Sequence, residues 1–281
     1  MPVDLKRING PENTVSYKLY TPSKTFKEEL KCLFKSNNKR QDGRNSLEHR
    51  KMFIKTGIVS QAKGSAYLEL GNTKVIVSVF DPREIPNKTD YSQKGVLYCE
   101  FKYATFSCPQ RRNFQQDSEE KQNSIILKQS LEPAVCLHEF PNFQVDIYAL
   151  ILENDGSSLS AAVTCACVAL AHASVPMYDL VTAVTMGVVD NQILMDPTLK
   201  EQQLCEVFDE TDTKSDHGII VTSFMSTHQQ ISQFYQTGNI NLENISKSIS
   251  ISTDASGDIK LLIEKCIVNH VLKGANKSNE E

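Results

Sequence analysis

An apolar strand, a short Gly/Ser loop and an apolar helix follow one another in residues 145–173, and this run constrains the fold most. Residues 145–152 are β-branched and aliphatic enough for a buried strand, and residues 160–173 are small and apolar enough for a buried helix. The loop opening the helix presents free N–H groups and the positive end of the helix dipole, which suit a phosphate or another anion. The cation that normally assists such a site is missing, because the position holds Leu159. The plainer interpretation is a helix start capped by Ser157 or Ser158.

Composition sets the outer limits of the interpretation. The 281 residues are 40% hydrophobic, enough for one large domain or two small ones, and no apolar run is long enough to predict a membrane span. The N-terminus lacks the apolar stretch of a secretory signal. The cysteines have no C-x-x-C spacing, so we expect reduced thiols in the cytosol or nucleus, no metal site and no disulfide framework. These cysteines are Cys32, Cys99, Cys108, Cys136, Cys165, Cys167, Cys205 and Cys266.

Charge is spread unevenly although the net charge is only -4. Residues 1–55 hold thirteen Lys/Arg against six Asp/Glu, which leaves 17 against 28 in the remainder. Residues 1–39 are therefore expected to form an extended basic arm, which either contacts nucleic acid or an acidic partner or is simply solvated. A short helix is possible at residues 25–34. The folded domain is expected at residues 40–273, followed by a flexible tail at 274–281.

Strands are predicted where β-branched and aromatic residues run between turn residues. They cover residues 57–61, 65–70, 74–80, 96–104, 180–189, 192–195, 204–208, 218–224 and 230–235. The Gly71-Asn72 pair predicts a hairpin, and Asp81-Pro82 is expected to end its second strand before a polar loop at 83–95. Helices are predicted at residues 118–137 and along an apolar stripe at 242–271, with an interruption at 254–257.

Several ordered blocks resemble the RNase PH family. They are Arg40-x-Asp42-Gly43-Arg44, the run 64–75 with its Gly71-Asn72 turn, Phe106-Ser107, Leu131-Glu132-x-Ala134-Val135, Asp155-Gly156-Ser157 and Met177-x-Asp179-Leu180. The match runs over roughly residues 40–273, and its several ordered blocks are more specific than any one motif. The blocks at 1–12 and 57–69 are similar to one eukaryotic branch, the mRNA transport regulator type of subunit in the six-membered RNase-PH-like ring of the RNA exosome.

The resemblance implies an α+β fold, RNase PH-like (ribosomal protein S5 domain 2-like), with two joined βαβ-like halves, mixed sheets and packed helices. Active family members degrade RNA from its 3′ end by phosphorolysis, which brings two anions together and requires cations and an acid. Their first arginine matches Arg111, and their second corresponds to Leu159. Their two aspartates correspond to Asp196 and Gln202, and a glutamine amide cannot replace the second carboxylate. Losing the loop arginine alone costs about 3 kcal/mol of transition-state stabilisation if losses at oxyanion sites are a guide.

The resemblance therefore predicts a non-catalytic ring subunit without a cofactor or metal, which helps to thread single-stranded RNA. Its expected partners are other RNase-PH-like ring subunits and S1/KH-type cap subunits, in the nucleus, including the nucleolus, and in the cytoplasm. The alternative is an active phosphorolytic exoribonuclease, and a third possibility is an independent RNA-binding module, which the acidic body disfavours. The six histidines show no ligand spacing and are expected to be structural.

Candidate RNA contacts lie in two loops. By resemblance, Arg83, Lys88 and Lys94 belong to a loop that faces the central pore of the ring, where Tyr91 is the one residue able to stack on a base. Arg111 and Arg112 form a basic loop that either contacts phosphate, across a subunit interface in some arrangements, or is a solvated pair. Asp196 has its own plain interpretation as the cap of the turn that begins with Pro197.

Overall fold

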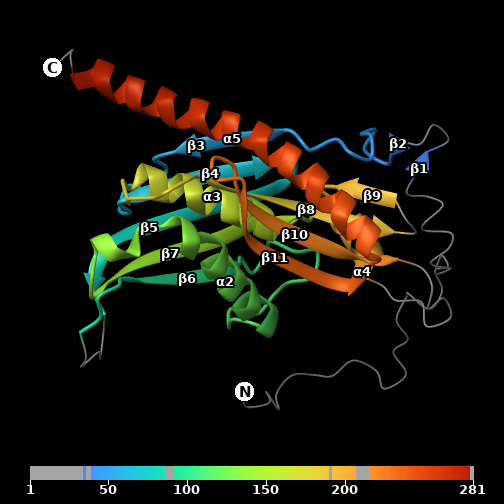
Figure 1. Ribbon diagram of the computed structural model, residues 1–281, viewed down its shortest axis with the longest axis horizontal. Coiled ribbons are helices and arrows are strands. Elements are labelled where there is room, and N and C mark those ends of the chain that lie inside the picture. Colours follow the sequence, from blue (N-terminus) through green and yellow to red (C-terminus); the bar gives the residue numbers. More distant parts are fainter. Residues whose placement is uncertain (1–33, 36–38, 86–90, 190–191, 207–215, 279–281) are drawn as a thin grey trace, which may run out of the picture.

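The computed structural model describes residues 34–35, 39–85, 91–189, 192–206 and 216–278 (Figure 1). The N-terminal arm and the possible helix at 25–34 therefore lie outside the described residues, except for two short strands near their end. The strands are β1 (Phe34–Lys35), β2 (Lys39–Arg40), β3 (Met52–Thr56), β4 (Gly64–Leu70), β5 (Thr73–Glu84), β6 (Val96–Tyr103), β7 (Phe143–Glu153), β8 (Val181–Val189), β9 (Gln192–Met195), β10 (His217–Met225) and β11 (Gln230–Asn239). The helices are α2 (Ser118–Leu131), α3 (Ser158–His172), α4 (Leu199–Glu206) and α5 (Leu242–Ser278), with 3₁₀ turns at Glu132–Ala134 and Leu137–Glu139.

Two sheets and the helices packed on them confirm the expected α+β class. The five-stranded sheet has the order β3-β4-β5-β7-β6 and is mixed, because β6 runs parallel to β7 while the other pairs are antiparallel. The four-stranded sheet has the order β11-β10-β8-β9 and is antiparallel throughout. The hairpin predicted at Gly71-Asn72 joins β4 to β5, and Gly71 takes the positive φ of 59° that such a turn requires.

Helix α3 lies between the two sheets and is the centre of the core. It packs on β4 and β5 of one sheet and on β8 and β10 of the other. Its residues 158–170 are all buried, including both Cys165 and Cys167. Burial on every side is expected for a helix that has apolar residues on every side. A Cβ on Gly64 would lie 2.3 Å from the Ala169 carbonyl oxygen, so only glycine lets β4 approach α3 so closely.

The strand predictions at 57–61 and 204–208 are wrong. Gly57 has a φ of 72° and follows the last residue of β3, so the strand lies before this glycine. Residues 57–59 are irregular and a turn begins at Ser60. The described part of the second segment belongs to α4, which starts with the capping-box sequence Thr198-x-x-Glu201. The Glu201 carboxylate accepts the Thr198 N–H at 2.8 Å, one of the two bonds of such a box. That motif was visible in the sequence and outweighs the β-forming residues that follow it.

Two proline-containing ends also differ from prediction. Strand β5 continues through Asp81-Pro82 to Glu84, because a register shift between Phe80 and Arg83 lets the chain keep pairing with β7. Helix α2 ends at Leu131 rather than at residue 137, because Pro133 cannot continue the helix and the chain tightens into a 3₁₀ turn.

Helix α5 is continuous across residues 254–257, so the predicted interruption is wrong. Gly257 faces open space, while the flanking side chains of Ala255, Ile259 and Ile263 are buried against the sheets and hold the helix together. The helix runs to Ser278, five residues into the segment predicted as a tail, and projects past β3 in Figure 1. None of the helices in the described ranges is long and apolar enough to cross a membrane.

Candidate functional site

A cleft of about 370 Å³ lies at the N-terminus of α3 and is also lined by residues of α2, α4, β10 and β11. Its lining includes three residues with charged side chains, the cation Arg112 and the carboxylates Glu119 and Glu206. The remaining lining is mainly amide, hydroxyl and apolar, and the side chains of Leu159 and Gln202 are both part of it. Leu159, at the position that the resemblance aligns with the family's loop arginine, is therefore an apolar part of the cleft wall and is only 8% exposed.

The loop before α3 has an uncommon backbone conformation that depends on a glycine. Gly156 has a φ of 85°, and Ser157 follows with a φ of 54°, an uncommon conformation for a residue with a side chain. A Cβ on Gly156 would meet the backbone of residues 197–199 within 2.6 Å, so the loop needs a glycine here on both counts. Ser157 occupies the N-cap position of α3, which was one of the two N-cap residues expected from the sequence. Its hydroxyl does not cap the helix, because it donates to the Pro197 carbonyl at 3.1 Å.

Gln202 reaches this loop from α4. Its side-chain oxygen accepts the Ser157 backbone N–H at 3.3 Å, and its amide nitrogen lies 3.4 Å from a carboxylate oxygen of Glu206. An anion bound at the start of α3 would compete for the same N–H group. Gln202, which the resemblance aligns with the family's second aspartate, thus occupies a donor that an anion would use.

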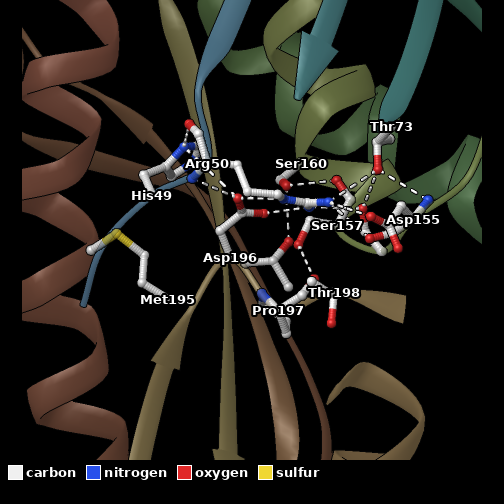
Figure 2. A network of polar contacts seen from close by, with 12 residues as sticks. His49, Arg50, Thr73, Asp155, Ser157, Ser160, Met195, Asp196, Pro197 and Thr198 are labelled. Atoms are coloured by element: carbon white, nitrogen blue, oxygen red, sulfur yellow. Dashed lines mark hydrogen bonds and ion pairs between the residues drawn. The ribbon is translucent and has the colours of Figure 1, made fainter. Parts of the chain in front are cut away.

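Asp196 lies on the other side of the loop, in a buried ion-pair network (Figure 2). Its two carboxylate oxygens accept from Arg50 Nε at 2.7 Å and Nη2 at 2.6 Å, and one also accepts the Arg50 backbone N–H at 3.1 Å. Arg50 continues into the loop, donating to the carbonyls of Asp155 at 2.8 Å and Gly156 at 3.1 Å. The prediction that Asp196 caps the turn at Pro197 is wrong, since its carboxylate is bound by Arg50.

The environment keeps Asp196 ionised. Burial raises its pKa, but the hydrogen bonds and charge of Arg50, with smaller contributions from His49 and Ser157, outweigh burial and lower the pKa to about 2. The same pair keeps Arg50 charged: burial lowers the pKa of its guanidinium, but the Asp196 carboxylate outweighs burial and raises that pKa. A carboxylate held in a bidentate ion pair is a poor proton donor at neutral pH.

The Arg40-x-Asp42-Gly43-Arg44 block holds the backbone of the same region. Arg40 is 1% exposed and donates to the Met195 carbonyl at 2.6 Å and the Asp196 carbonyl at 3.3 Å. Arg44 donates to the Asp196 carbonyl at 3.3 Å and pairs with Asp42 at 2.6 Å. This block therefore anchors the chain around Asp196, which has a φ of 51°, to the start of the domain.

The two arginines of the predicted basic loop have different surroundings. Arg112 donates to a Glu119 carboxylate oxygen from both terminal nitrogens at 3.0 Å and lies 4.1 Å from the centre of the Tyr103 ring. The Tyr103 hydroxyl is 2.8 Å from that of Ser158, which connects this group to the start of α3. Arg111 is exposed and has no ion pair within the described part of the chain. Arg112 thus faces the cleft with its charge paired, whereas Arg111 is the one available to an external phosphate.

The residues predicted to face a pore are only partly described. Arg83 lies on the extended end of β5, where its Nε is 2.6 Å from a carboxylate oxygen of the buried Asp146, while its side chain stays 56% exposed. Lys94 and Tyr91 are exposed, with Tyr91 at 73%. Lys88 lies outside the described residues. RNA contact by these residues stays a prediction.

Sequence reasoning missed Arg50, Thr73, Tyr103 and Glu119. Arg50 and Asp196 are 146 residues apart, and nothing in the local pattern around Arg50 distinguishes it from the other charged residues of its turn. Thr73 Oγ1 donates to the Gly156 carbonyl at 2.8 Å and accepts the Asp155 N–H at 3.1 Å, again across a long separation. The available signal for Arg50 was a charged residue before the folded domain's first predicted strand, and such residues are common on protein surfaces.

Comparison with known proteins identifies similar sequences over most of the domain. The profile of the 3′ exoribonuclease family, domain 1, matches residues 48–176, and that of domain 2 matches residues 179–208. The chain is 37% identical to exosome complex component RRP41-like of Arabidopsis thaliana, covering 81% of this chain and 84% of that protein. It is 35% identical to exosome complex component MTR3 of Homo sapiens, covering 72% and 75% respectively.

Solved structures are similar at the level of the fold. Rice (Oryza sativa) Rrp46 superposes with a TM-score of 0.70 at 23% identity, covering 81% of this chain and 99% of that one. A chain of the Archaeoglobus fulgidus exosome with RNA bound to its active site gives the same TM-score at 21% identity, covering 83% and 95%. The arrangement of two sheets around a buried helix is thus common to all three.

Proposed function

This chain belongs to the 3′ exoribonuclease family, the RNase PH family, and from that premise we propose that it is a non-catalytic subunit of the hetero-hexameric ring of an RNA exosome. Its role is to complete the ring and help form the channel that leads single-stranded RNA to nucleases elsewhere. Similarity to exosome components of plant, human and archaeal origin supports the assembly. Its neighbours are then other RNase-PH-like subunits, with S1/KH-type cap subunits above them, in the nucleus, the nucleolus and the cytoplasm.

The observation that carries the non-catalytic role is the contact between Gln202 and the Ser157 N–H. Phosphorolysis needs inorganic phosphate to approach an internucleotide phosphate, and both anions need cations or free donors. Here the amide of Gln202 uses one such donor, Leu159 supplies no charge, and Arg112 is already paired with Glu119. Arg111, which matches the family's first arginine, is exposed and is not among the residues that line the cleft. The remaining family aspartate, Asp196, is held by Arg50.

The competing function is an active phosphorolytic exoribonuclease, and native affinity capture of the tagged full-length chain discriminates between the two. We expect several different chains of similar size at one copy each, together with cap proteins. The same preparation tests RNA shortening in phosphate buffer. Recovery only as a self-associated oligomer that shortens RNA in the presence of phosphate would establish the enzyme and overturn our proposal.

A double substitution tests whether the missing groups alone explain the loss of catalysis. Leu159→Arg with Gln202→Asp restores the two family residue types, yet we expect phosphorolysis to stay at background. The reason is that the cleft wall packs around the apolar side chain of Leu159, so nothing holds the new guanidinium in the orientation that phosphate binding needs. Arg112 also stays paired with Glu119. Robust phosphate-dependent shortening by this variant would show that the scaffold is two residues from an enzyme. Leu159→Gln with unchanged Gln202 is the matched control for polarity without charge.

A further inference from the structure

The outer edge strands of the two sheets differ in whether another segment of the chain covers them. An edge strand has a row of backbone N–H and C=O groups without sheet partners, which attracts other strands unless it is covered. The edges are β3 and β6 in the five-stranded sheet and β9 and β11 in the four-stranded sheet. In Figure 1, β11 forms the outer border of its sheet next to β10.

Three of these edges are covered by the chain itself. On β6, the Phe101 N–H donates to Ser124 Oγ at 2.9 Å and the Tyr103 N–H donates to the Glu120 carboxylate at 2.8 Å, both from α2. On β9, the Met195 N–H donates to the Ser46 carbonyl at 2.8 Å, and its carbonyl accepts from Arg40.

The edge of β3 is covered by α5. Lys51 and Gly57 use their backbone groups toward β4, so the alternate residue Ile54 directs its groups outward. The Ile54 carbonyl accepts from Cys266 Sγ of α5 at 3.5 Å. Helix α5 therefore lies where an added strand would have to pair.

Strand β11 is the exception. Over its ten residues, no described group outside β10 makes a hydrogen bond to its backbone. It contains no charged residue and no proline, the features that usually prevent strand addition, and none of its residues is buried. Ile231 is 42% exposed and Phe234 is 38% exposed. The residue types of β11 are thus those of a strand paired on both edges, whereas its outer edge and its apolar side chains are exposed.

Charge near β11 points to the kind of strand that fits. Tyr235 of β11 and Glu206 of α4 line the same cleft, and Glu206 has no ion pair with any described residue. A second copy of this chain would bring another Glu206 and another strand without a cation. A strand that carries Lys or Arg on the side facing the cleft would complement the carboxylate.

We propose that β11 pairs, through its outer backbone edge, with a strand of a neighbouring RNase-PH-like subunit that places a Lys or Arg near Glu206. The four-stranded sheet then continues across the subunit interface. Backbone pairing supplies the affinity, and the side chains of Ile231 and Phe234 are covered on either face of the extended sheet. This inference rests on the proposed function, because a ring neighbour supplies the strand.

Hydrogen exchange of the native assembly, captured through the tagged full-length chain, tests the pairing directly. Alternate β11 amides point away from β10, and in a paired strand they should exchange at least about tenfold more slowly than exposed loop amides of the same chain. If ring-type subunits are recovered but these amides exchange at loop rates, the strand pairing is wrong while the proposed function stands. If no such subunit is recovered, both are wrong.

Substitution gives an independent test. Ile231→Lys with Phe234→Lys should lower the recovery of one ring neighbour about tenfold, since strand addition would bury two lysines. Phe53→Lys is the matched control: Phe53 is 53% exposed on β3, whose edge α5 covers, and recovery should not change. Circular dichroism of each variant establishes that it folds. Equal recovery with the edge variant and the control, or a homodimer joined through β11, would overturn the proposal.

Discussion

The two sides of the loop at residues 154–158 differ sharply. On its buried side, Arg50, Asp196 and Thr73 form a network in which each charge is paired within hydrogen-bond distance. On its cleft side, Leu159 and Gln202 line the wall, at the two positions where the resemblance to active family members predicts a cation and a carboxylate. One backbone loop is therefore held by a fully paired network on one side and, on our proposal, has a replaced reactive surface on the other. We expect the anchoring network to be needed for the fold, and the cleft residues to tolerate change without loss of the loop geometry.

The strongest test of this comparison removes the charge of Asp196. Asp196→Asn leaves the buried Arg50 guanidinium without its counter-charge, and we expect the free energy of unfolding to fall by about 3–5 kcal/mol. Urea unfolding followed by circular dichroism measures it. Glu153→Gln, which removes an exposed carboxylate paired with Lys74, is the matched control and should change stability by less than about 1 kcal/mol. Similar losses in both variants would contradict an anchoring role for the buried network.

The acid side of the stability curve gives the next largest effect. The pKa of Asp196 is lowered in the folded chain to about 2, so its contribution is present above its ordinary pKa and is lost as the pH falls through the folded value. Between pH about 4 and pH about 2, wild type should lose about 2 kcal/mol that the Asp196→Asn variant does not lose. Parallel curves for the two proteins through this range would show that Arg50 does not stabilise the ionised form.

On the cleft side we expect smaller stability effects. Gln202→Ala removes one half-buried hydrogen bond to the Ser157 N–H, and the free energy of unfolding should fall by about 1 kcal/mol or less. The freed N–H group should then bind inorganic phosphate more strongly than wild type, which a phosphate-dependent rise in Tm would detect. A loss as large as that of Asp196→Asn would remove the distinction between the two sides of the loop.

Arg111 and Arg112 extend the comparison to RNA binding, because one guanidinium is exposed and the other is paired. Arg111→Ala should weaken the affinity of the assembly for single-stranded RNA by about threefold and reduce its salt dependence. Arg112→Ala should change RNA affinity less, because Glu119 already neutralises that guanidinium. Filter binding at two salt concentrations compares them. A larger effect of Arg112→Ala would mean that the Glu119 pair opens when RNA binds.

Local patterns predicted the parts of the fold whose periodicity reflects burial. The apolar runs became β7, α3 and β8, and the Gly71-Asn72 turn joined β4 to β5. The failures arose where a distant partner decided the conformation. Pairing with β7 carried β5 past Pro82, and packing on the sheets carried α5 past Gly257. The Thr198-x-x-Glu201 box was a local signal that the sequence analysis overlooked.

The sequence by itself determined which residue types are available for chemistry, since no fold can turn Leu159 into a cation or Gln202 into a carboxylate. Only the tertiary structure decided what the remaining groups do. It paired Asp196 with Arg50 from 146 residues away and turned Gln202 toward the Ser157 N–H. It also covered β3, β6 and β9 with other segments, whereas none of the described segments covers the outer edge of β11. The physical reason is that side-chain chemistry is local to the chain, whereas ion pairing, burial and edge protection depend on contacts between segments that the sequence keeps far apart.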